Sequence, residues 1–346
     1  MRKTSKVVLI IAASLLLVGG ILAGAGYALG GMQSLRLTPD GPVLGSVAVD
    51  MASFNVSAAE IHAAAADTAD KGTSGDASGS AADIVALEVR VDVSTIRFEE
   101  GSDWSFRGQY DRGSSEFSWS VDKGVLVIDC SQDSGIGWEF WGNPLASAGA
   151  GVNALHSEAV VVYPRSAKLD SLTVHSGLAA VENPGLSARN IEIDLDLGSL
   201  SLSDVTCSQL DIDLDMGSAT LLRCTTDKYT EVALSMGDLD AFDCAFEAFN
   251  LECSMGSLEF SGSLTGPAFL SLSMGSANLT CDQKLSKISY DLKCDMGSVS
   301  INGRDEGDEQ KVFAIGEPEL EIIIRCSMGS IDLYAQESTA RQGGAD

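Results

Sequence analysis

A short glycine motif that returns at a nearly fixed interval is the feature that most constrains how this 346-residue chain can fold. Its first copy is Asp196-Leu197-Gly198-Ser199, and later copies carry Met before the glycine. The central glycines are Gly198, Gly217, Gly237, Gly256, Gly275, Gly297 and Gly329. Five of the six intervals are 19 to 22 residues; the last is 32 residues and holds an insertion, 302–318, that we expect to be an exposed loop. Repeats of this length indicate supersecondary units that stack on one another.

Apolar residues alternate with polar ones on both sides of each glycine. In the first copy, Ile193, Leu195 and Leu197 stand five, three and one positions before the glycine. Leu200 and Leu202 stand two and four positions after it. A period of two is typical of a β-strand with one buried and one solvated face. Both apolar rows point to one side only if the chain bends at the glycine, which predicts a corner there.

One bent strand cannot bury its own apolar row, so consecutive copies are predicted to stack into an all-β solenoid with rungs of about 20 residues. We assign the regular rungs to residues 191–334 and an irregular leading β region to residues 84–190. Equivalent residues then form ladders spaced about 4.8 Å apart, with the seven motif glycines as structural corners.

Six of the nine methionines stand directly before a motif glycine. The alternation places them in the inward row, so we predict that they fill the core, as methionine commonly does. A copper or cofactor site built from thioethers would need a convergent geometry and usually His or Cys partners, so core filling is the preferred interpretation.

Outward carboxylates are predicted to stack in the first two rungs. Asp194 and Asp196 should lie beside Asp213 and Asp215 at strand spacing. Carboxylate oxygens are ligands that calcium prefers, so a calcium site is one interpretation. The other is a solvated acidic face that keeps the solenoid soluble, because the sequence has neither an EF-hand loop nor a glycine-rich calcium repeat.

The chain has eight cysteines, an even number that permits full pairing. Cys224 and Cys244 stand seven positions after consecutive motif glycines, and Cys294 and Cys326 stand three positions before theirs. Each pair is predicted to lie within disulfide range, whereas Cys253 and Cys294 would be two rungs apart. The alternative is that each thiol is a small buried hydrophobe. No Cys-x-x-Cys motif supports a zinc site.

An aromatic segment interrupts the strand pattern between residues 135 and 153. It brings Trp138, Phe140 and Trp141 close together in the sequence. Exposed aromatic side chains can stack on sugar rings or insert among lipid headgroups, so these three residues are the candidate ligand-binding site. The alternative is that they fold back to cap the open end of the solenoid.

Charge and composition exclude other functions. The chain has 22 Lys and Arg against 49 Asp and Glu, a formal net charge of −27. Nucleic-acid binding needs clustered basic side chains, so we expect no nucleic-acid partner. With three histidines, His62, His156 and His175, and no motif that pairs a nucleophile with a base, we expect no catalysis and no cofactor.

The N-terminal residues predict a membrane anchor. Residues 1–6 are basic, and residues 7–32 are uncharged and strongly apolar. About 20 apolar residues span a bilayer, and the basic tip keeps the N-terminus in the cytoplasm. A cleaved signal peptide is the alternative, because Ala23-Gly24-Ala25 offers a cleavage site.

Two segments outside the repeats are predicted to lack a core. Residues 33–83 are rich in small polar residues, which indicates a flexible linker, with a short ordered patch from Val47 to Ile61. Residues 335–346 are predicted to be a disordered tail.

The repeats and the strands before them resemble the bacterial putative-adhesin family, a domain of unknown function built of β-strand repeats and often carried behind an N-terminal membrane helix. The resemblance runs from Ile84 to Leu333 and rests on the strand-like segments 84–91, 96–101 and 125–129, the segment 159–164 that ends in proline, and the glycine corners. It implies a surface β-repeat protein without catalytic residues.

These features predict a single-pass protein of the bacterial plasma membrane whose C-terminal domain lies outside. The outer domain is predicted to be a non-catalytic, adhesin-like binding module for a cell-wall glycan, a surface glycan or another envelope protein. The alternative is a structural or regulatory partner of another envelope membrane protein, which would act through close packing of the glycine-rich anchor helix.

Overall fold

The computed structural model describes residues 35–38, 41–44, 51–70, 84–91, 95–111, 116–130, 158–314 and 318–336. Strands β1 (Leu35–Thr38) and β2 (Gly41–Leu44) pair as an antiparallel hairpin. All other described strands belong to one continuous sheet, in a unit separate from this hairpin.

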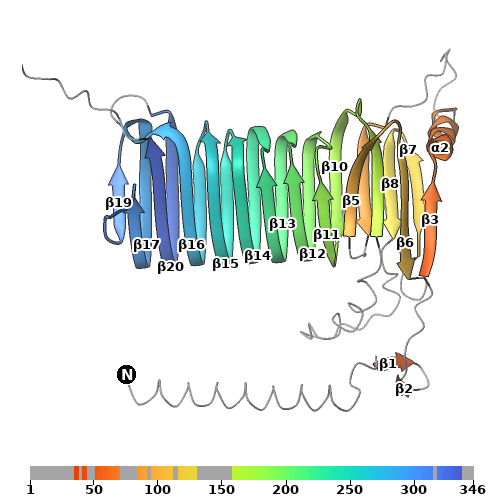
Figure 1. Ribbon diagram of the computed structural model, residues 1–346, viewed down its shortest axis with the longest axis horizontal. Coiled ribbons are helices and arrows are strands. Elements are labelled where there is room, and N and C mark those ends of the chain that lie inside the picture. Colours follow the sequence, from red (N-terminus) through yellow and green to blue (C-terminus); the bar gives the residue numbers. More distant parts are fainter. Residues whose placement is uncertain are drawn as a thin grey trace, which may run out of the picture. The chain divides into compact units, whose positions relative to one another are not determined.

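Seven long strands carry the glycine motif. They are β12 (Ala188–Ser203), β13 (Thr206–Leu222), β14 (Thr225–Phe246), β15 (Phe249–Leu264), β16 (Ala268–Lys284), β17 (Ile288–Ile301) and β20 (Leu320–Gln336). Neighbours run parallel, and their motif glycines pair directly, as Gly198 does with Gly217. The strands therefore stack as the rungs of a solenoid (Figure 1), which confirms the prediction of an all-β, repeated fold.

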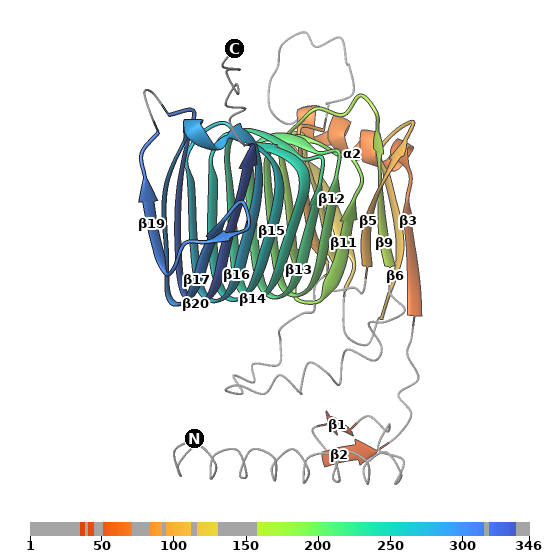
Figure 2. The same cartoon turned by 60° about the vertical axis from the view of Figure 1, so that its left-hand side comes forward.

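Each rung bends at its glycine, so that its two halves lie in two facing layers of the continuous sheet (Figure 2). The first half of β12 pairs with β10 (Leu169–Ser176), and its second half, from Gly198, pairs with β11 (Ala179–Asn183). Six of the seven glycines have φ between +144° and +155°. A Cβ on Gly256 would lie 1.6 Å from the carbonyl oxygen of Gly237. Both the backbone conformation and the close approach of the next rung therefore require glycine.

The core lies between the two halves of the rungs. Leu195 and Leu200, three positions before and two after the glycine, are each 1% exposed. The residue directly before the glycine points outward instead: Met255 is 41% exposed and Met296 is 64% exposed. The predicted inward methionine row is therefore wrong. At a sharp corner the two halves converge and leave no interior volume beneath this position, so its side chain projects from the convex edge.

The spatial order of the rungs departs from the sequence order at the C-terminal end. β20 pairs with β16 on one side and with β17 on the other, so β17 is the end rung. A short 3-10 helix, η1 (Leu285–Lys287), precedes β17. The insertion expected to be a loop contains β18 (Arg304–Asp305) and β19 (Glu309–Val312). Both pair antiparallel with β17, which covers its free edge.

The leading β region extends the same stack. Its strands are β4 (Ala86–Val91), β5 (Thr95–Gly101), β6 (Ser105–Asp111), β7 (Ser118–Asp122), β8 (Val125–Cys130) and β9 (Glu158–Pro164). β4 and β5 form a rung between β10–β11 on one side and β8–β9 on the other. β7 and β6 then pair antiparallel with β8 and β9.

Part of the predicted linker is folded into this end of the stack. β3 (Met51–Val56) pairs antiparallel with β6, and helix α2 (Ala58–Asp70) follows it. Phe54 stacks on Phe117 with ring centroids 4.2 Å apart, and Ile61 of α2 is fully buried. The order predicted from Val47 to Ile61 is therefore found over residues 51–61, and it continues to Asp70, where the sequence predicted a linker. The apolar side chains of this segment close the end of the core.

The predicted membrane anchor, residues 7–32, lies outside the described residues. Within the part of the chain that the structure describes, no helix has the length and apolar character needed to cross a bilayer.

Candidate functional site

A groove of about 490 Å³ lies where two rungs of the leading β region meet the first repeat. Its lining residues are Arg97, Phe98, Glu99 and Glu100 of β5, Glu182, Asn183 and Pro184 at the end of β11, and Ser201 and Ser203 of β12. β11 pairs with both β5 and β12. The sheet therefore fixes the spacing of polar groups that are far apart in the sequence.

Arg97 lies at the centre of the charged groups around the groove. Its Nε donates to Glu182 at 2.9 Å, and its Nη1 donates to Glu158 of β9 at 2.8 Å. The hydrogen bond to Glu182 and the charges of Glu182 and Glu158 raise the pKa of Arg97. Carboxylates from both neighbouring strands thus hold the guanidinium in place.

The other carboxylates of the groove are also paired. Glu99 accepts from Arg107 at 2.8 Å, and Glu100 accepts from Arg165 at 2.7 Å. Three arginines and four glutamates on this surface carry a net charge of −1. They are Arg97, Arg107, Arg165, Glu99, Glu100, Glu158 and Glu182. The groove is therefore nearly neutral, on a chain whose net charge is −27.

One wall of the groove is a rigid turn. The Asn183 side chain is buried, and its Oδ1 accepts from the backbone N–H groups of Gly185 and Leu186. Its Nδ2 donates to the carbonyl of Leu186. Carboxylates that accept, a guanidinium that donates and serine hydroxyls that do both suit a hydroxyl-rich ligand.

The four predicted calcium ligands lie on two adjacent rungs, as the register requires. Asp194 pairs with Asp213, and the His175 Nδ1 lies 3.5 Å from the carboxylate of Asp194. Burial, followed by the charges of Asp194, Asp215 and Asp211, raises the pKa of Asp213.

The structure places these carboxylates on one outward face without forming a metal-binding group. Among the described residues, no group of three or more His, Cys, Asp or Glu side chains is placed to hold a metal ion. The Cα atoms of carboxylate residues two positions apart on a strand are separated by about 6.6 Å. The calcium site and the solvated acidic face therefore both stay interpretations of the sequence.

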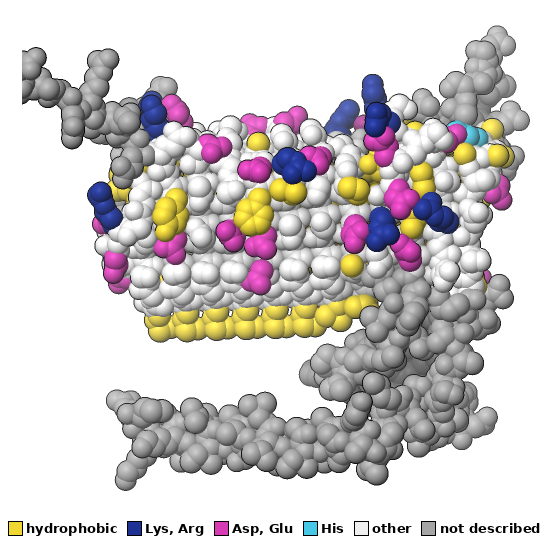
Figure 3. Space-filling model, in the orientation of Figure 1, with side chains coloured by type: hydrophobic (Ala, Val, Ile, Leu, Met, Phe, Trp, Pro, Cys, Tyr) yellow, Lys and Arg dark blue, Asp and Glu magenta, His cyan; other side chains and the backbone are white. Residues whose placement is uncertain are grey.

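Sequence reasoning missed an exposed apolar edge. The methionine edge consists, in spatial order, of Met216, Met236, Met255, Met274, Met328 and Met296, which pair rung to rung. It forms a straight row along one side of the solenoid (Figure 3). One signal could have revealed it: the buried positions vary among Leu, Ile, Val, Ala, Cys and Phe from copy to copy, whereas the position before the glycine is Met in six of the seven copies.

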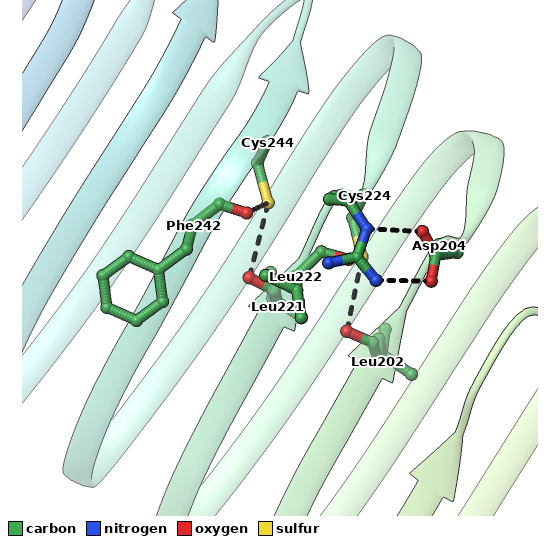
Figure 4. Close-up of polar contacts among 8 residues, drawn as sticks. Leu202, Asp204, Leu221, Leu222, Cys224, Phe242 and Cys244 are labelled. Atoms are coloured by element: carbon green, nitrogen blue, oxygen red, sulfur yellow. Dashed lines mark hydrogen bonds and ion pairs between the residues drawn. The ribbon is translucent and has the colours of Figure 1, made fainter.

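All eight cysteines are buried and free. Cys224 and Cys244 lie on adjacent rungs and direct their thiols toward carbonyls of the preceding rung, Leu202 at 3.6 Å and Leu221 at 3.5 Å (Figure 4). The neighbouring Cys224 thiol and burial raise the pKa of Cys244.

The second predicted cysteine pair is also adjacent in space. Cys294 pairs with Cys326 in the β17–β20 register, but Leu272 and Cys326 separate Cys253 from Cys294, one rung more than predicted. Disulfides at Cys224–Cys244 and Cys294–Cys326 stay predictions for an oxidising compartment. The predicted aromatic site, Trp138, Phe140 and Trp141, lies outside the described residues.

Comparison with known proteins gives a family and distant structural likenesses. The family model described as Toastrack DUF4097 matches residues 84–333. No curated protein matches the chain. One similar crystal structure is that of a putative adhesin from Bacteroides fragilis NCTC 9343, which has 11% sequence identity and a TM-score of 0.46. The match covers 83% of this chain and 98% of the adhesin chain.

Two further crystal structures are similar. A putative adhesin from Parabacteroides distasonis ATCC 8503 is 12% identical, covers 84% of this chain and 98% of its own, and has a TM-score of 0.41. A putative cell adhesion protein from Clostridium sporogenes ATCC 15579 is 11% identical, covers 74% of this chain and 94% of its own, and has a TM-score of 0.27.

Proposed function

We propose that this chain, which belongs to the Toastrack DUF4097 family, is an envelope binding module that holds a glycan of the bacterial wall or surface in the groove beside Arg97. The N-terminal segment would anchor the module in the plasma membrane, with the solenoid outside. The observation that supports this proposal is the convergence of a fixed guanidinium, carboxylates and hydroxyls from three rungs on one open, nearly neutral groove.

The charge of the groove favours a neutral, hydroxyl-rich ligand over an ionic one. Every carboxylate of the charged set already accepts a hydrogen bond from an arginine, and each retains further lone pairs that sugar hydroxyls can use. A groove open to solvent admits an internal stretch of a polysaccharide, whereas an enclosed pocket would admit only an end. Binding of this kind needs no chemical step, so we propose no catalysis.

A binding assay with matched variants tests this function. Immobilised full-length protein is incubated with purified bacterial sacculi and, separately, with detergent-solubilised membranes. Ser201→Arg places a long side chain in the groove. Asn278→Arg introduces the same side chain at the equivalent ladder position four rungs away and serves as the control.

We expect wild type and Asn278→Arg to retain wall glycan and Ser201→Arg to lose it by at least about tenfold, since filling a site removes its contacts. Retention that is equal in all three proteins would refute the groove as the site. Trp138→Ala with Trp141→Ala tests the predicted aromatic site in the same assay. Retention of a membrane protein alone would instead favour a structural partner that acts through the anchor.

A further inference from the structure

We propose that the methionine edge binds soft monovalent cations, Cu(I) or Ag(I), between the thioethers of neighbouring rungs. This site lies apart from the groove and does not depend on glycan binding. The thioethers are accessible to an ion from solvent, because five of the six methionines are at least 40% exposed and Met216 is half-buried.

The geometry of the ladder fits a two-coordinate ion. Met236 pairs with Met255 and Met255 with Met274 in direct register, so their Cα atoms are at strand spacing, about 4.8 Å. Two sulfur atoms on opposite sides of one ion, with bonds of about 2.3 Å as in zinc–sulfur bonds, would be about 4.6 Å apart. Neighbouring thioethers in the same rotamer are therefore already near the separation that a bridging ion needs.

The residue type points to soft-metal chemistry. Thioethers favour Cu(I) over hard cations such as calcium or magnesium. An edge that served only as an apolar contact would be equally well built from leucine, which occupies the equivalent Leu197 position of the first rung. The chain has nine methionines, and six of them are in this one ladder.

The charge around the edge favours a cation over other occupants. Asp215, Asp238 and Asp295 stand within two residues of the ladder, and the chain carries a net charge of −27. Asp215 and Asp238 accept hydrogen bonds from Ser235 and Ser257 of the next rung, which holds them beside the thioethers. A second copy of this chain or an anionic lipid surface would be repelled.

Silver(I) titration of the full-length protein tests the proposal. The protein is labelled with [13C]methyl-methionine and titrated with silver nitrate in chloride-free buffer, and the methyl signals are followed by NMR. Met51 of β3, outside the ladder, is the internal control. Because buried thiols also bind silver, the methyl signals and not the total uptake are the measurement.

Two triple variants distinguish the effect of having neighbouring methionines from the effect of the number of methionines. The alternating triple, Met236→Leu, Met274→Leu and Met296→Leu, leaves three methionines with no adjacent pair. The block triple, Met216→Leu, Met236→Leu and Met255→Leu, leaves three contiguous methionines. Both variants carry the same number of conservative changes and keep all eight cysteines.

We expect the edge methyl signals of wild type to shift on silver addition while Met51 does not. The block triple should keep this response, and the alternating triple should bind at least about tenfold more weakly, because a single thioether lacks the second donor. Unmoved edge signals in wild type, or equal responses of the two triples, would overturn the proposal.

Discussion

Replacing Gly256 by alanine should unfold or displace the central rung of the solenoid. Gly256 has φ of +155°, and an added Cβ would lie 1.6 Å from the carbonyl oxygen and 2.7 Å from the carbonyl carbon of Gly237. The backbone conformation alone costs an L-residue about 1–3 kcal/mol. The overlap is with backbone atoms of the preceding rung, β14, so relief requires the two rungs to separate and their ladder hydrogen bonds to lengthen. We expect a total loss above about 4 kcal/mol, beyond the range of most single substitutions.

Gly303→Ala is the matched control, because Gly303 also has positive φ, +75°, but an added Cβ would meet nothing within 4 Å. It should cost only the left-handed backbone penalty, about 1–2 kcal/mol. Urea unfolding followed by circular dichroism compares the two variants, and limited proteolysis reports whether Gly256→Ala folds at all. A Gly256→Ala protein that unfolds within about 1 kcal/mol of Gly303→Ala would refute the close stacking of the corners.

Three further predictions address charge, polar burial and thiol reactivity. Because burial and neighbouring acids raise the pKa of Asp213, its ionised form weakens the folded state above that pKa. Asp213→Asn should therefore stabilise the folded state at pH 7 by on the order of a few tenths of a kcal/mol, which a higher melting temperature would report, and the gain should vanish below pH 3.8. Thr226 and Thr230 are buried with their hydroxyls 2.9 Å apart, so Thr230→Val should cost about 1–2 kcal/mol in urea unfolding, and adding Thr226→Val should recover most of it. Burial raises the pKa of Cys207 and Cys281 to about 12, so mass spectrometry should find both unalkylated by iodoacetamide at pH 8 until denaturant is added.

The regular rungs could be predicted from the sequence because three local signals agree. Alternation of period two, a glycine at a fixed position and an interval near 20 residues each indicate the same bent strand. The register follows from aligning the glycines, so that Asp194 beside Asp213 and Cys294 beside Cys326 could be placed without coordinates. The prediction of which side chains point inward was wrong at the bend, since Met255 continues the alternation in the sequence but lies on the outside of the corner.

The groove could not be predicted in the same way. Arg97 and Glu182 are 85 residues apart, and no local pattern links them. Their contact depends on the insertion of β4 and β5 between two other rungs, which is a property of the whole leading region. Small residues also concealed the second half of helix α2, since residues 62–70 have the composition of a linker although Ala65 is buried.

The order of the rungs is the part of the fold that a repeat cannot specify, because every rung presents the same register to either neighbour. What distinguishes the C-terminal end is the chain between the last two motifs. Lys311 of β19 and Arg325 of β20 both contact Asp291 of β17, from opposite sides of that strand. An exposed edge of a parallel sheet would pair with other chains. β18 and β19 cover the edge of β17 at the C-terminal end of the stack. β7, β6 and β3 cover the edge at the opposite end. The placement of β20 between β16 and β17 therefore leaves as the end rung the one strand whose following segment can fold back and close the stack.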